Sequence, residues 1–153
     1  MTAPRSNSQR LTTYSAALDF AEGQVATLIE KHPDFFPIYT VNGKWRHGGE
    51  LWTDWTGGFL AGMMWQFHFR ERQAAKSAGK SPDTLNSSVW RKRAEHYSKL
   101  LEHRQHDRAV HDLGFIFLST YLPWYEVTGD KHMHQVLIQA GRTLAMRFME
   151  KGQ

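Results

Sequence analysis

The chain has 153 residues, a length typical of one domain, and its 41% hydrophobic and 22% charged residues are ordinary for a globular protein. It contains no cysteine, which excludes disulfides and thiolate chemistry. The formal charge of +4 is compatible with nucleic acid or an acidic sugar as partner, but acidic residues lie among the basic ones and no nucleic-acid-binding module accompanies them. Nucleic-acid binding is therefore the least favoured interpretation.

Residues 1–13 are predicted to be a flexible N-terminal tail, because this segment is polar, contains Pro4 and lacks the apolar core of a secretory signal. The longest strongly apolar run, residues 113–122, is too short to span a bilayer. These features predict a cytoplasmic protein that does not enter a membrane, with one domain over residues 14–153.

The first predicted helix starts near Tyr14, carries apolar residues at steps of three and four, and ends before Pro33. A loop over residues 32–54 follows, with a turn signal at Asn42-Gly43 and a short strand over residues 38–41 for which no partner is obvious. The periodicity thus predicts a helix followed by a long irregular connection.

The second predicted helix starts at Thr56 or Gly57 and runs to about Ala75. Glycine destabilises a helix by about 0.5–1 kcal/mol relative to alanine, so Gly58 and Gly62 near its start indicate close approach of another backbone or of a ligand. A frayed first turn is the alternative.

Three more helices are predicted over residues 89–105, 113–127 and 131–149. Ser88 is the expected cap of the first and Asp130 of the last, Gly129 closes the middle one, and Pro123 should kink or divide it. The sequence therefore predicts an all-α fold of antiparallel helical hairpins.

Nine histidines suggest a metal site, but the spacings argue against one. On a helix His132 and His134 point to different sides, so they cannot share an ion. His103 and His106 are three residues apart and could share one, but no third ligand follows from the sequence. We expect neither a metal nor another cofactor.

The segment that reads HDLGF, residues 111–115, places an ionisable pair and a glycine at the start of a long apolar run. An aspartate there is a helix cap or a reactive acid. Capping is the ordinary role, whereas the apolar neighbours Leu113 and Phe115 would give Asp112 surroundings suited to proton transfer. Both interpretations are open on this motif alone.

A second segment, TDWTGGFLAGMMW over residues 53–65, precedes it by about fifty positions. In this order the two motifs resemble those of the unsaturated glucuronyl hydrolases, glycoside hydrolase family 88. The resemblance extends from about Tyr14 to the C-terminus. It implies that the chain is the N-terminal portion of an (α/α)6 barrel of six helical hairpins.

The resemblance also implies a function. Asp112 corresponds to one of two catalytic aspartates, and Trp55 and His111 to residues of the sugar site. The implied substrates are acidic 4,5-unsaturated uronic acid oligosaccharides released by polysaccharide lyases, and the implied reaction is hydration of the C4=C5 bond. In the family the second aspartate lies in a later segment that this sequence does not contain, so we expect the chain to be incomplete and inactive alone.

Several positions depart from the family pattern. Gly57 stands where the family often has Asp or Asn, Leu60 where it often has an aromatic residue, and Val110 where many members have a second His. Substrate linkage and sulfation are therefore open.

The rival interpretation is an all-α protein-interaction module without catalysis. If the chain is part of a barrel, the incomplete barrel should leave apolar area uncovered and promote self-association. The residues expected on that face are Phe115, Leu118 and Leu122, together with Leu137, Leu144 and Phe148 of the last helix.

Overall fold

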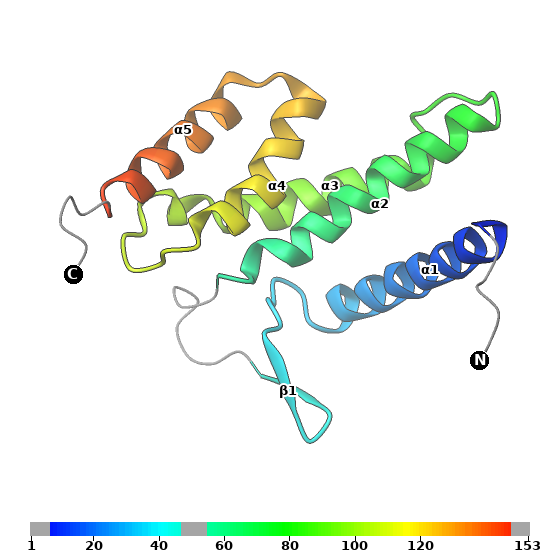
Figure 1. The fold of residues 1–153 in the computed structure, drawn as a ribbon, viewed down its shortest axis with the longest axis horizontal. Coiled ribbons are helices and arrows are strands. Elements are labelled where there is room, and N and C mark those ends of the chain that lie inside the picture. The colour runs from blue at the N-terminus through cyan, green and yellow to red at the C-terminus, as the bar shows by residue number, and fades with distance from the viewer. Residues whose placement is uncertain (1–6, 47–54, 148–153) are drawn as a thin grey trace. The chain divides into compact units, whose positions relative to one another are not determined.

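The computed structural model describes residues 7–46 and 55–147. Within them lie five α-helices, a 3₁₀ helix and a two-stranded antiparallel hairpin, which confirms the predicted all-α class (Figure 1). None of the helices in these ranges is long and apolar enough to cross a membrane. The elements are α1 (Asn7–Lys31), β1 (Tyr39–Val41), β2 (Lys44–Arg46), α2 (Gly57–Ser77), α3 (Leu85–Leu100), the 3₁₀ helix η2 (Glu102–His106), α4 (Leu113–Thr128) and α5 (Lys131–Ala145).

The chain divides into two compact units, Met1–Phe35 and Phe36–Gln153. The first contains α1, which begins at Asn7 and not near Tyr14, so residues 7–13 of the predicted tail are helical. Residues 1–6 lie outside the described part. The helix ends at Lys31, as the proline two residues later predicts.

The second unit opens with the hairpin of β1 and β2, in which Thr40 is paired with Trp45. Asn42 and Gly43 both have positive φ, 50° and 71°, as expected for a tight two-residue turn between strands. The predicted short strand therefore has a partner in the residues that follow it. Sequence analysis missed that partner because β2 is only three residues long.

Helices α2 and α3 form an antiparallel hairpin with a buried polar contact. The indole Nε1 of Trp65 donates to Ser98 Oγ over 3.1 Å, and the rings of Phe67 and Trp90 lie 4.9 Å apart. The predicted cap at Ser88 is wrong. Thr84 precedes α3, and its hydroxyl accepts a hydrogen bond from the backbone N–H of Ser87, so α3 starts earlier than predicted. The helix also ends earlier, at Leu100, and the residues predicted to continue it form the 3₁₀ helix η2.

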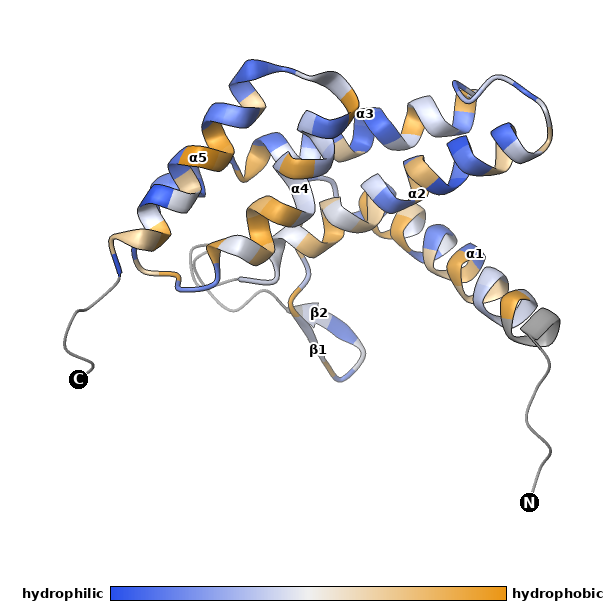
Figure 2. Ribbon diagram, turned by 45° about the horizontal axis from the view of Figure 1, so that its top comes forward, coloured by the Kyte–Doolittle hydropathy of each residue, from blue (hydrophilic) through white to orange (hydrophobic). Residues whose placement is uncertain are grey.

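Helices α4 and α5 form the next hairpin, and Figure 2 shows the first turns of α4 as largely apolar. Gly129 ends α4 in the left-handed conformation, with φ 66°, and Asp130 caps α5 by accepting from the N–H of His132, so both predictions are confirmed. Pro123 does not divide α4, which continues to Thr128. The predicted end of α5 at residue 149 lies outside the described residues; the helix ends at Ala145.

The starts of α2 and α4 touch through their backbones at Gly58. A Cβ placed on Gly58 would lie 2.6 Å from Ile116 Cα and 2.8 Å from the carbonyl oxygen of Phe115. One turn later, a Cβ on Gly62 would lie 3.0 Å from Ser119 Cβ. The prediction of close backbone approach is confirmed, and the alternative of a frayed turn is wrong because both glycines lie within α2.

Part of the predicted uncovered apolar face is present on α4. The side chains of Phe115 and Leu118 are 49% and 62% exposed, whereas Leu122 is half-buried. On α5, Leu144 is exposed and Leu137 is half-buried; Phe148 lies outside the described residues. The exposed face therefore centres on the first two turns of α4.

Replacing Gly58 by alanine should destabilise the fold by about 1–3 kcal/mol or more, because the new methyl group would meet backbone atoms that cannot rotate away. Gly141 is the matched control, since it lies in α5 with nothing within 4 Å of its added Cβ. Gly141→Ala should stabilise by about 0.5–1 kcal/mol. Urea unfolding followed by circular dichroism measures both, and equal effects of the two substitutions would contradict the backbone contact.

Lowering the pH should destabilise the protein through His68, which is 1% exposed. Its Nδ1 donates to the carbonyl of Ser87 over 2.8 Å, and its buried Nε2 has no hydrogen-bond partner among the described residues. Burial lowers the pKa of His68 below its ordinary value of 6.5, against the opposing effect of the hydrogen bond to Ser87. The unfolded chain therefore binds the proton more readily, so this stability is present above about pH 6.5 and is lost as the pH falls below it.

The measurement is the urea midpoint at about pH 7.5 and about pH 5.5. His68→Asn keeps a donor at the position of Nδ1 but cannot be protonated, so the variant should lose less stability between the two conditions than the parent. An equal loss of stability in both proteins would show that titratable groups other than His68 cause the acid sensitivity.

Candidate functional site

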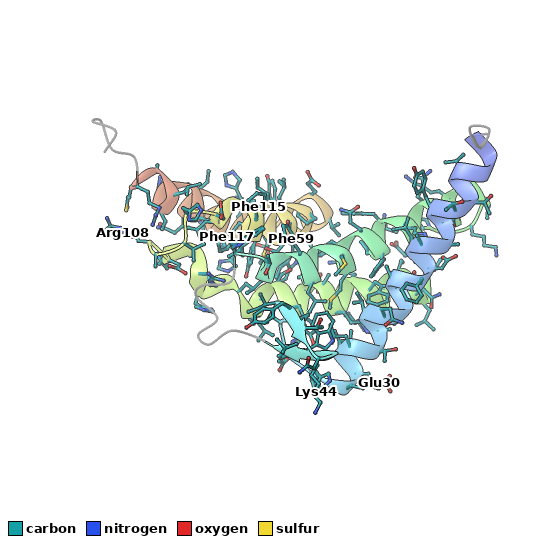
Figure 3. All side chains as sticks on the ribbon, turned by 60° about the horizontal axis from the view of Figure 1, so that its bottom comes forward. Glu30, Lys44, Phe59, Arg108, Phe115 and Phe117 are labelled. Carbon is teal, nitrogen blue, oxygen red and sulfur yellow. The ribbon has the colours of Figure 1, made fainter. Side chains whose placement is uncertain are left out.

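The candidate site lies where α2 and α4 begin, and its most prominent feature is a cluster of three aromatic side chains. The rings of Trp55, Phe59 and Phe115 contact one another, with centroids 5.9 Å apart for Trp55 and Phe59, 5.3 Å for Trp55 and Phe115, and 5.9 Å for Phe59 and Phe115. We call these three residues the aromatic platform. Figure 3 labels Phe59 on α2 and Phe115 on α4.

The aromatic platform is only partly covered by protein. Trp55 is 42% exposed, Phe59 39% and Phe115 49%. Aromatic residues of this size normally bury most of their area in a core, so three adjacent rings left half exposed form a surface able to bind a flat apolar face. The approach of the α2 and α4 backbones at Gly58 explains why side chains from two helices meet here.

Asp112 directly precedes α4, three residues before Phe115. Its backbone carbonyl accepts the N–H of Phe115 over 3.0 Å, but its side chain makes no capping hydrogen bond. The interpretation of Asp112 as a side-chain cap is therefore wrong. The carboxylate instead lies 3.0 Å from Nε2 of His111, and the two side chains are 26% and 74% exposed.

The loop that leads to Asp112 is held by a buried arginine. Arg104, 1% exposed, binds Asp107 through Nη2 and Oδ2 at 3.2 Å, and Asp107 Oδ1 accepts the N–H of Ala109 over 2.9 Å. Val110 then packs into the interior, 6% exposed. These contacts fix the chain just before His111 and Asp112, although the sequence motifs alone did not single out either Arg104 or Asp107.

The structure thus brings the three predicted site residues to the starts of the same two helices. Trp55 contacts Phe115, one helical turn after Asp112, and His111 pairs with Asp112. Sequence analysis expected Phe115 on an uncovered apolar face, but it placed Phe59 among the apolar helix residues and missed its exposure. Their spacing was the available signal, because Phe59 follows Trp55 by four positions and Phe115 follows Asp112 by three, so each lies on the same side of its helix.

This arrangement combines an apolar surface, a partly open carboxylate and an imidazole. Apolar ring faces pack against the C–H face of a sugar, while the polar pair can hydrogen-bond hydroxyl groups and exchange protons. Within the described residues, no group of three or more His, Cys, Asp or Glu side chains could hold a metal ion. The site is suited to carbohydrate binding.

Comparison with known proteins extends this description. No model of a known protein family matches the chain. The unsaturated chondroitin disaccharide hydrolase of Streptococcus pneumoniae (strain ATCC BAA-255 / R6) is 30% identical over 102 residues, which are 65% of this chain and 22% of that protein.

A crystal structure of a mutant unsaturated glucuronyl hydrolase from Streptococcus agalactiae, complexed with dGlcA-GalNAc6S, shares the fold. The match has a TM-score of 0.61 and 24% sequence identity, and covers 88% of this chain and 32% of that protein. The chain thus spans about a fifth of the length of the curated relative and about a third of the structural neighbour. The resemblance suggested by the two motifs is confirmed: the chain is similar, in sequence and in helical fold, to part of an unsaturated glucuronyl hydrolase.

Proposed function

We propose that the chain supplies one part of the sugar site of an unsaturated glucuronyl hydrolase. The complete enzyme would act on 4,5-unsaturated uronic acid oligosaccharides released when lyases degrade acidic polysaccharides. The observation that carries the proposal is the half-exposed aromatic platform at the helix ends that also present Asp112 and His111. The similarity to an enzyme named for unsaturated chondroitin disaccharides supports it.

In this proposal the indole of Trp55 packs against the sugar ring. The reaction adds a proton to C4 and the oxygen of water to C5, which yields a hemiketal; the hemiketal then opens and releases the remaining sugar. Asp112 transfers a proton, and His111 holds its carboxylate through the contact at 3.0 Å.

Glycoside chemistry normally uses two carboxyl groups. Asp112 supplies one of them, and in our proposal a segment outside these 153 residues supplies the other.

The platform can be tested by binding of an unsaturated uronyl disaccharide to this chain, measured by isothermal titration calorimetry. Trp55→Ala should weaken binding about tenfold, because it removes the ring that contacts both phenylalanines. Trp45→Ala is the matched control, since Trp45 is a similarly exposed tryptophan, 47%, on β2. Equal losses in the two variants would argue against a site at the platform.

The 153-residue chain alone should show negligible hydration of the same disaccharide, several orders of magnitude below a complete enzyme, because one of two carboxylates is missing. Loss of the ultraviolet absorbance of the conjugated double bond reports the reaction. Robust turnover that disappears in Asp112→Asn would contradict the need for a second segment, yet it would identify Asp112 as catalytic.

The alternative function is an interaction module, and a groove between α2 and α4 favours it. The groove has a volume of about 460 Å³ and is lined by Phe59, Met63, Leu118 and Pro123 among others. Phe59, Met63 and Leu118 are 39%, 40% and 62% exposed. An apolar surface of this kind is typical of protein contact sites.

If this face is an interaction surface, the purified chain should self-associate or bind a hydrophobic dye. Sedimentation velocity at several concentrations measures the association, and Leu118→Gln should reduce it. A single monomeric species with a sharp melting transition and no dye binding would show that the exposed apolar face does not drive association.

A further inference from the structure

A second groove, of about 500 Å³, lies between η2 and α5. None of the aromatic platform residues lines it. Its polar lining comes from Gln105 and His106 of η2 and from five residues of α5: His132, His134, Gln135, Gln139 and Arg142. Grooves of this size accommodate small-molecule ligands.

A hydrogen bond joins the two walls of the groove. Thr143, 2% exposed on α5, donates through Oγ1 to the carbonyl oxygen of Gln105 over 2.6 Å. The side chain of Gln139 donates in turn to Thr143 Oγ1 over 3.2 Å. The groove therefore has fixed walls.

The nearest carboxylate on η2 is already engaged. Glu102 Oε2 accepts the hydroxyl of Tyr121 over 2.8 Å, and Oε1 lies 3.0 Å from Nε2 of His132. Neither aspartate nor glutamate is among the residues that line the groove. In the described part of the chain, no carboxylate lies within ion-pair distance of Arg142.

The polar side chains of the groove that can face a ligand are thus mainly hydrogen-bond donors. Arg142 offers a planar fork of N–H groups that matches the two oxygens of an oxyanion. The rings of His106 and His134 and the amide of Gln135 can add further N–H groups. The lining thus combines one cationic side chain with neutral N–H donors and contains no carboxylate that would compete for them. Such a lining favours anions over cations.

We propose that the groove between η2 and α5 binds an oxyanion, a sulfate, phosphate or carboxylate group, with Arg142 as its principal ligand. The proposal does not require Asp112 or the aromatic platform. A free inorganic ion and an acidic sugar present the same chemistry, and the experiment below distinguishes these two sources.

The test is a titration of the ¹⁵N-labelled chain with sodium sulfate, followed through backbone amide shifts at constant ionic strength. The proposal expects saturable shifts confined to η2 and the exposed side of α5. Arg142→Gln should weaken sulfate binding about tenfold. Lys92→Gln removes one positive charge from the exposed surface of α3 and should change the affinity less than about twofold.

Shifts spread over the whole surface, or equal weakening by both substitutions, would overturn the proposal, because they indicate nonspecific charge attraction. His134→Gln serves as a second variant if Arg142→Gln disturbs the fold, and it should weaken binding about twofold to fivefold. Parallel titrations with inorganic phosphate and with glucuronic acid identify the source. Tighter binding of the sugar acid than of either inorganic ion indicates an acidic sugar, and the reverse order indicates a free oxyanion.

Failure of this test would leave the proposed hydrolase function intact, since the test measures Arg142 and not Trp55. Conversely, loss of sugar binding in Trp55→Ala would say nothing about the groove.

Discussion

The contact between α2 and α4 at Gly58 is the constraint on which the candidate site depends. A Cβ at this position would lie 2.6 Å from Ile116 Cα, closer than two such atoms can approach. Any side chain would therefore push the helices apart and separate the rings of Phe59 and Phe115. Two helix starts that sequence places nearly sixty residues apart meet because one residue has no side chain.

A second set of contacts holds the elements that follow α3. Tyr121, fully buried on α4, donates to Glu102 of η2, and burial raises the pKa of Tyr121 well above its usual range. Glu102 also contacts His132 of α5. These contacts connect η2 to α4 and α5, and the pair of Arg104 and Asp107 holds the loop that follows η2. The same network therefore stabilises the loop before Asp112 and one wall of the second groove.

The same apolar side chains serve two roles on the α2 and α4 face. Phe59 belongs to the aromatic platform and also lines the groove of about 460 Å³. The sugar binding that we propose at the platform and the alternative, packing of another protein segment into the groove, would therefore share Phe59. This overlap predicts that bound sugar and self-association influence each other, and it explains why the enzyme interpretation and the interaction-module interpretation both draw on the same exposed face.

The sequence by itself determined the helices, the left-handed Gly129, the cap at Asp130 and the two motifs, because these depend on apolar periodicity and on hydrogen bonds within a few residues. It failed where neighbouring residues compete for one local role, as with Thr84 and Ser88, and where the side chain of Asp112 faces His111 instead of the helix.

Only the tertiary structure decided the exposure of Phe59, the identity of the backbone that Gly58 contacts and the groove between η2 and α5. Each of these joins segments far apart in the chain. Burial and close approach depend on how helices pack, and no local pattern specifies which distant residue will fill or leave open a given space.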